Sequence, residues 1–147
     1  MKNLLRRWGT MRKKKDYYIN QHSCFLLQYH LVFVTKYRHQ VIDGELKEAL
    51  LNYTRNYFKE RDCNILAINT DKDYLHIVFE AYPNLNLSHF INAFKSASSR
   101  RMRTDFAEYL QPFYWKPYFW SMSYFVGTVN EKSTQIVQDY VRNQDIR

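Results

Sequence analysis

Residues 74–81 read Tyr-Leu-His-Ile-Val-Phe-Glu-Ala, and this stretch decides the fold. Strand side chains alternate between two faces, so the pattern predicts a strand with two different surfaces. The apolar face comprises Leu75, Ile77, Phe79 and Ala81. The opposite face comprises Tyr74, His76, Val78 and Glu80. Because the apolar face is suited to pack against helices, we expect His76 on the other side of a sheet.

Predicted elements on either side of this strand complete a β-α-β-β-α-β order with one further helix. The expected strands are 24–35, 63–69, 74–81 and 120–129, and the expected helices are 44–59, 88–105 and 133–144. Ser88 and Ser133 are the expected N-caps of the last two helices. This order predicts an α+β, ferredoxin-like antiparallel sheet with helices on one face and an additional C-terminal helix. RNA-recognition modules, small enzymes and DNA-nicking domains share the plan, so the fold alone does not decide function.

The composition narrows the classes of function. The 147 residues carry a formal charge of +8 with a pI near 9.5, and 18% are aromatic. No apolar run reaches the ~18 residues of a membrane span, and two cysteines make neither a disulfide framework nor a four-cysteine zinc site. No phosphate loop or nucleotide-cofactor motif is present. We expect a cytoplasmic domain whose foremost partner is nucleic acid.

Positive charge gathers in two places. Residues 1–22 hold seven basic residues against one acid, and are expected to form a basic N-terminal arm ahead of a single domain at 23–147. The arm either binds phosphates, through Arg12, Lys13, Lys14 and Lys15, or is a solubilising tail. The second group is Lys95, Arg100, Arg101 and Arg103. Lys95 and Arg103 share a helix face with Ser99, which suits phosphate contact but equally suits a solvated surface.

A tyrosine on the closing helix is a candidate nucleophile. Tyr140 and Gln144 lie four residues apart, on one helix face. A phenolate attacks a phosphodiester to form a covalent phosphotyrosine, and a divalent cation offsets the phosphate charge. The His76 imidazole and the Gln144 amide oxygen are candidate ligands for that ion. The alternative is that Tyr140 is an ordinary packing residue.

Several blocks in one order resemble the single-tyrosine transposases of small bacterial insertion sequences, in the histidine–hydrophobic–histidine nuclease superfamily. The blocks are 29–38 (YHLVFVTKYR), 90–101 (FINAFKSASSRR), 119–124 (FWSMSY) and 140–144 (YVRNQ). The resemblance implies a homodimeric enzyme that binds hairpins in single-stranded DNA and needs Mg²⁺ or Mn²⁺. It implies Tyr140 as the nucleophile, leaving a 5′-phosphotyrosine and a free 3′-hydroxyl, with His76 and Gln144 as metal ligands.

One triplet departs from the family pattern. The paired histidines of the family straddle a hydrophobic residue, whereas this chain has Tyr74-Leu75-His76. Three outcomes are open. The site binds metal through His76, Gln144 and water, helped by Glu80, Asp71 or Asp73; or Tyr74 itself serves as an oxygen ligand; or catalysis is lost.

The alternatives in function follow from this departure. The leading hypothesis is an active strand transferase, and the second is a catalytically weakened or inactive hairpin-binding protein derived from one. A third is an RNA-binding module, which requires exposed aromatic side chains such as Tyr29, Phe33 and Tyr74 on an open sheet face.

Overall fold

A four-stranded antiparallel sheet organises the chain in the computed structural model, which describes residues 12–13 and 16–144, with side chains from residue 16 onward. Its strands are β4 (Leu27–Thr35), β5 (Asn64–Asp71), β6 (Tyr74–Ala81) and β7 (Trp120–Thr128). They lie in the order β5-β6-β4-β7, so β6 and β4 are central. Val32 lies opposite His76 on one side and opposite Phe125 on the other, which places these three side chains on the same face.

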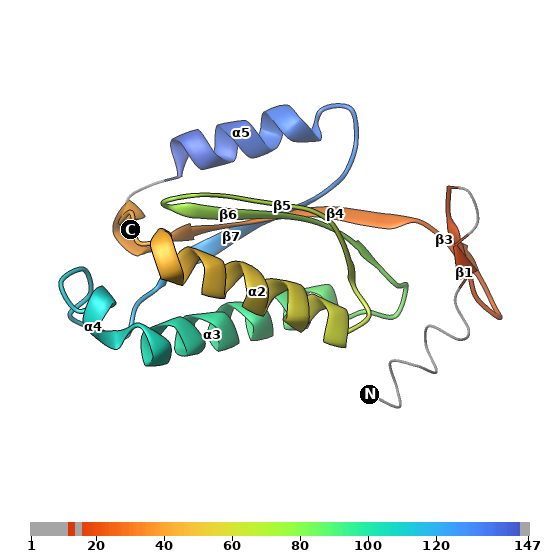
Figure 1. Ribbon diagram of the computed structural model, residues 1–147. Coiled ribbons are helices and arrows are strands. Elements are labelled where there is room, and N and C mark those ends of the chain that lie inside the picture. The colour runs from red at the N-terminus through yellow and green to blue at the C-terminus, as the bar shows by residue number, and fades with distance from the viewer. Residues whose placement is uncertain (1–11, 14–15, 145–147) are drawn as a thin grey trace.

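Helices cover the two faces of the sheet unequally. The long helices α2 (Gly44–Glu60) and α3 (Leu87–Asp105) pack on one face, and α5 (Ser133–Asn143) lies across the other, as Figure 1 shows. The short helix α4 (Ala107–Leu110) and the 3-10 turn η1 (Lys36–Arg38) lie at one end. The predicted α+β fold is therefore confirmed, including a C-terminal tyrosine-bearing helix outside the helical layer.

The core lies between the sheet and the two long helices. Leu75, Ile77, Phe79 and Ala81 are all buried there, as the alternation in 74–81 predicts. Aromatic rings fill the centre: Phe58 meets Phe79 edge-on at 5.1 Å between ring centroids and Phe94 at 5.4 Å. Tyr29 and Phe33 also face this core, with Phe33 fully buried. They do not form the open aromatic surface that an RNA-binding sheet requires.

The N-terminal part adds a small second sheet of β1 (Arg12–Lys13), β2 (Tyr18–Ile19) and β3 (Cys24–Phe25). The expected strand 24–35 is therefore two strands, interrupted at Leu26, because Phe25 pairs with Tyr18 of β2 and stacks on its ring at 5.5 Å. The Tyr18 hydroxyl donates to Glu80 at 2.6 Å, which ties this sheet to β6. No helix in the described residues is long and apolar enough to cross a membrane.

Two helix starts differ from the expectation. Asn86, not Ser88, caps α3, because its side chain accepts a hydrogen bond from the backbone N–H of His89. Ser133 is the first residue of α5 and not its N-cap, which is Lys132. The Ser133 hydroxyl instead contacts Asn130 and His30. This second difference matters for the site.

Candidate active site

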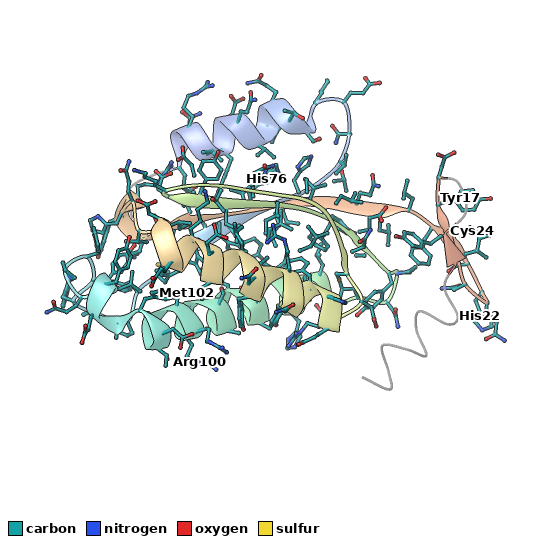
Figure 2. The ribbon with its side chains drawn as sticks, in the orientation of Figure 1. Tyr17, His22, Cys24, His76, Arg100 and Met102 are labelled. Atoms are coloured by element: carbon teal, nitrogen blue, oxygen red, sulfur yellow. The ribbon has the colours of Figure 1, made fainter. Side chains whose placement is uncertain are left out.

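His76 lies near the middle of β6, on the sheet face that α5 covers (Figure 2). The sequence alternation predicts this face, and the structure confirms it. The side chain is half-buried, and burial together with the neighbouring His30 lowers the pKa of His76 to about 4. His76 is therefore a neutral imidazole at neutral pH, which is the form that binds metals and accepts protons.

A second histidine, which the sequence analysis did not single out, stands beside it. His30 projects from β4, and its Nδ1 lies 2.8 Å from Nε2 of His76, with the rings stacked at 5.1 Å between centroids. The other ring nitrogen, Nε2, lies 2.9 Å from the hydroxyl oxygen of Ser133 at the start of α5. His30 is only 7% exposed, and burial lowers its pKa.

Tyr140 lies on α5, above the same sheet face. Its ring packs against Phe125 of β7 at 5.4 Å, and its hydroxyl is buried near the Ser123 hydroxyl without a close hydrogen bond to any described residue. Burial raises the pKa of Tyr140, although the Ser123 hydroxyl and the Arg38 charge act in the opposite direction. A buried polar atom without a partner is uncommon in a folded protein, and it marks this hydroxyl as a functional candidate.

Gln144, at the end of α5, turns towards the same strand. Its Nε2 donates to the Ser123 hydroxyl at 2.9 Å, and within the described part of the chain its amide oxygen has no partner. Arg38 holds this end of the helix, because its Nη1 donates to the carbonyl of Val141 at 2.7 Å. Tyr140 and Gln144 thus face one strand, β7, as their spacing predicts.

Two of the three acidic residues suggested as additional ligands, Glu80 and Asp73, are bonded to other side chains. Glu80 is buried, and its carboxylate accepts hydrogen bonds from Tyr18, Gln28 and Asn64 at the far end of β6. Asp73 forms an ion pair with Arg38 at 3.0 Å. Glu80 and Asp73 therefore already have polar partners of their own, and their assistance in metal binding stays a prediction. Asp71 lies exposed at the end of β5, where it accepts from the backbone of Lys72.

The potential ligand atoms that remain on this face are of mixed type. No group of three or more His, Cys, Asp or Glu residues in the described part of the chain could hold a metal ion. Available donors on the α5 side are the second ring nitrogen of His76, the Gln144 amide oxygen and the Tyr74 phenol, which faces the same way as His76. One imidazole with oxygen donors suits Mn²⁺ or Mg²⁺ with water completing the shell.

Comparison with known proteins identifies the chain. The family model described as IS200-like transposases matches residues 23–144. The chain belongs to this family. The ISDra2 transposase TnpA of Deinococcus radiodurans is 31% identical over 120 residues, which are 82% of this chain and 85% of that protein. The transposase of insertion sequence IS200 from Salmonella typhimurium is 32% identical over 123 residues, 84% of this chain and 80% of that protein.

A solved structure supports the same conclusion. The crystal structure assigned to a transposase of Deinococcus radiodurans R1 superposes with a TM-score of 0.80 at 33% identity, covering 92% of this chain and 100% of that one. The family resemblance expected from the sequence is thus confirmed, and the molecule is an IS200-like transposase.

The second predicted basic group of the transposase lies on the other side of the sheet, along α3. Arg100 is exposed, Arg103 donates to Ser99 at 3.3 Å, and Arg101 pairs with Asp105 at 2.8 Å. The Lys95 ammonium donates to the carbonyl of Met122 at 2.6 Å. Of the proposed arm contacts, Lys14 and Lys15 lie outside the described residues, and the backbone of Arg12 and Lys13 forms β1.

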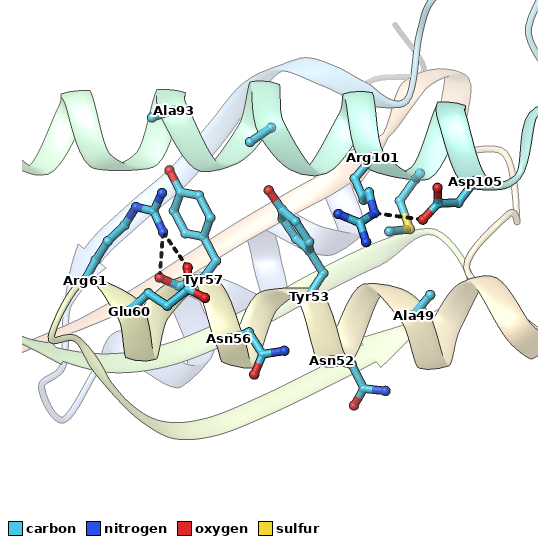
Figure 3. Close-up of a pocket in the computed structure, with 12 residues that line it drawn as sticks. Ala49, Asn52, Tyr53, Asn56, Tyr57, Glu60, Arg61, Ala93, Arg101 and Asp105 are labelled. Carbon is cyan, nitrogen blue, oxygen red and sulfur yellow. Dashed lines mark hydrogen bonds and ion pairs between the residues drawn. The ribbon is translucent and has the colours of Figure 1, made fainter. Parts of the chain in front are cut away.

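One cavity of the transposase, about 650 Å³, is a groove between α2 and α3 (Figure 3). Its walls include Tyr53, Tyr57 and Arg61 from α2 and the loop after it, and the Arg101–Asp105 pair from α3. It lies on the helical side of the sheet, away from His76 and Tyr140. The candidate active site is therefore the sheet face beneath α5, and not this groove.

Proposed function

We propose that this transposase cuts and rejoins single-stranded DNA at the hairpin-bearing ends of its mobile element, with Tyr140 as the nucleophile. The observation that supports this most directly is the buried Tyr140 hydroxyl, which makes no close hydrogen bond to a described residue, is influenced by the Ser123 hydroxyl and the Arg38 charge, and lies over the sheet face that carries His76. A packing tyrosine would bury its ring and either expose or bond its hydroxyl.

The reaction proceeds by two exchanges at phosphorus. The Tyr140 oxygen forms a bond to the phosphorus, the bond to the 3′-oxygen breaks, the phenol loses its proton and the 3′-oxygen gains one. The products are a 5′-phosphotyrosine and a free 3′-hydroxyl. Attack by a 3′-hydroxyl on the phosphotyrosine reverses these steps on a new strand and releases the phenol, so no ATP is required.

Mg²⁺ or Mn²⁺ is the proposed cofactor, held by His76 and Gln144 with the Tyr74 phenol as a further oxygen donor. When bound, such an ion offsets the phosphate charge. The neutral His76 provides a lone pair for the ion, and Arg38 and Ser123 favour the ionised form of Tyr140. We also propose that the transposase acts as a homodimer, in which α5 can complete the site of the partner subunit.

The test is capture of the covalent intermediate. A 5′-extended, hairpin-bearing single strand incubated with the full chain and Mn²⁺ or Mg²⁺ should yield a protein–DNA adduct that survives denaturing electrophoresis. Tyr140→Phe should abolish the adduct, while Tyr109→Phe, a matched change on the remote helix α4, should not. Absence of an adduct from the wild-type chain with either ion would refute the cleavage proposal.

The second candidate is a hairpin-binding protein with weakened or lost catalysis, and Tyr74 favours it. A neutral phenol is a poorer ligand than the imidazole it replaces, so we predict that Tyr74→His raises Mn²⁺ affinity and the rate of adduct formation. Isothermal titration and adduct yield against time measure the two effects. If Tyr74→His changes neither quantity, position 74 is not a ligand position. Salt-dependent hairpin binding that Tyr140→Phe leaves unaltered, without any adduct, would identify the inactive form.

A further inference from the structure

An unbroken chain of polar contacts joins the sheet to the tyrosine helix. It runs from His76 of β6 to His30 of β4 at 2.8 Å, and from His30 to Ser133 of α5 at 2.9 Å. Ser133 begins the helix on which Tyr140 follows two turns later, about 10 Å along the axis. His30 thus contacts both the proposed metal ligand and the element that carries the proposed nucleophile.

The donor and acceptor of each hydrogen bond in this series can be assigned from its last contact, between Ser133 and Asn130. The Ser133 oxygen lies 2.8 Å from the carbonyl oxygen of Asn130, and a carbonyl can only accept, so the Ser133 hydrogen points there. The Ser133 oxygen must then accept at its other contacts, from the backbone N–H of Asn130 at 3.1 Å and from Nε2–H of His30.

The tautomers of the two histidines follow in turn. A neutral imidazole with its proton on Nε2 has a lone pair on Nδ1, so His30 accepts from Nε2–H of His76. His30 is buried against a second imidazole, and both conditions favour its neutral form. His76 is left with its proton on Nε2 and a lone pair on Nδ1, the nitrogen that no described residue contacts.

We infer that His30 is a positioning residue of the transposase, which sets the tautomer of His76 so that Nδ1 is its ligand atom and which seats the start of α5 through Ser133. The inference rests on the proposed function only in assigning a ligand to His76. Metal-binding histidines are commonly held in this way, with the second ring nitrogen bonded to a fixed partner. Here that partner is itself bonded to the tyrosine helix, so His30 couples the orientation of His76 to the position of the start of α5.

A packing role alone does not explain why His30 is a histidine. His30 is nearly fully buried beside Val32 and Val34 in β4, where an apolar side chain would avoid the cost of removing an imidazole from water. Both of its ring nitrogens are bonded, to partners 46 and 103 residues away in the chain. Such a doubly bonded histidine fixes orientation as well as filling space.

The test is the protonation pattern of the ring nitrogens in the metal-free full chain. Long-range ¹H–¹⁵N spectra of histidine-labelled protein near pH 7.5 resolve the tautomers of the five histidines, and His76→Gln assigns the signal of His76. We expect His76 with its proton on Nε2. His30→Leu should replace this pattern by a mixture of tautomers and weaken Mn²⁺ binding about tenfold or more. His30→Asn, which keeps an acceptor at the δ position, should preserve both.

A second pair of variants covers the case in which His30→Leu does not fold. Ser133→Ala removes the acceptor for Nε2–H of His30 and should release the His30 tautomer, whereas Ser133→Thr keeps the hydroxyl and should not. A proton on Nδ1 of His76 in the wild-type chain, or an unchanged His76 signal in His30→Leu, would overturn the inference. The expected tautomers without any covalent adduct would instead contradict the proposed cleavage and leave the positioning role intact.

Discussion

At the scale of single residues, the site combines two histidines that are neutral with a tyrosine that is protonated. Burial lowers the pKa of His30 and of His76, and raises that of Tyr140. In the free protein, two neutral imidazoles and a protonated phenol therefore lie between the sheet and α5. Arg38 and Ser123 partly counter the effect of burial on Tyr140, so the environment that protects the phenol also contains groups that favour its ionisation.

The unpaired Tyr140 hydroxyl gives a stability prediction that separates a functional from a structural tyrosine. A buried hydroxyl without a partner costs free energy, so Tyr140→Phe should leave the free energy of unfolding unchanged or raise it by up to about 1 kcal/mol. Tyr114→Phe is the matched control, because that buried hydroxyl donates to the carbonyl of Lys36 at 2.9 Å and its loss should cost about 1 kcal/mol. Urea unfolding measures both; an equal loss in the two variants would contradict the assignment.

The lowered pKa of His76 predicts acid sensitivity of the metal-free protein. The pKa lies near 4 in the folded chain against an ordinary 6.5, so between these values the unfolded chain binds more protons. The free energy of unfolding should therefore fall as pH drops from 6.5 towards 4. Allowing for solvent screening of this half-buried group, we expect a loss of about 1–2 kcal/mol.

Thermal or urea unfolding across that pH range measures the acid effect. His76→Gln should flatten the pH dependence, while His22→Gln, at an exposed position, should leave it as in the wild-type chain. An identical slope in His76→Gln would show that the acid sensitivity has another source.

At the scale of elements, α5 is held at both ends by side chains from other parts of the fold. Ser133 bonds to His30 at the start, and Arg38 at the other end bonds to the Val141 carbonyl while pairing with Asp73. A cation at a helix C-terminus is favoured by the partial negative charge of the free carbonyls. Arg38 reaches this position from η1 with a φ of +57°, a backbone conformation uncommon for residues other than glycine.

Removing this clamp should loosen the end of α5 that carries Tyr140. Arg38→Ala loses charged hydrogen bonds, and we expect amide protection over residues 140–143 to fall about tenfold, equivalent to about 1.4 kcal/mol. Arg38→Lys should restore little, because an ammonium cannot serve both partners with the fork of a guanidinium. Hydrogen exchange by mass spectrometry measures the change.

Arg142→Ala provides the control for the clamp. Its exposed pair with Asp139, at 3.7 Å, should contribute less than about 0.5 kcal/mol. Equal protection losses in Arg38→Ala and Arg142→Ala would mean that α5 is not clamped by Arg38.

A helix or strand can be predicted from the sequence when its bounds depend on residues that are close together in the chain. The strand 74–81 is found with the expected bounds, because its alternation is local and its two faces differ in polarity. The break at Leu26 could not be predicted, since it results from the pairing of Phe25 with Tyr18. The predicted N-cap of α3, Ser88, is wrong for a local reason. Asn86 and Ser88 are both good N-caps, and only the hydrogen bond from the His89 N–H decides between them.

The site is predictable only where neighbours in the chain share a face. Spacing places Tyr140 and Gln144 together, and alternation places Tyr74 with His76. His30 was missed because it begins a continuous buried run, 30–35, where polarity does not reveal the facing side. Alternation within that run would have put His30, Val32 and Val34 on one face, but its contact with His76 depends on strand register, which no local pattern contains.

At the scale of the whole molecule, the two faces of the sheet have separate characters. His30 and His76 belong to the sheet face that α5 covers, and Tyr140 belongs to α5 itself, while the helix α3 with its basic residues packs on the opposite face (Figure 1). If both faces serve the same reaction, DNA that is bound along α3 must also extend to the face beneath α5. The charges on α3 are not equivalent in this respect, because Arg101 is paired with Asp105, whereas Arg100 is exposed and has no ion-pair partner among the described residues.

This difference predicts unequal losses of hairpin affinity from variants that each remove one positive charge. Arg100→Ala and Arg103→Ala should each weaken binding and reduce the slope of log K against log salt by about 0.7–0.9, the value for one phosphate contact. Arg101→Ala should have a smaller effect, because Asp105 already neutralises that guanidinium. Arg55→Ala, an exposed arginine on α2, is the control for net charge.

Fluorescence anisotropy with a labelled hairpin from 50 to 300 mM salt measures the slopes. The same small loss in all four variants would mean that α3 contributes only to the overall field, whereas losses confined to Arg100 and Arg103 would place the DNA backbone along α3.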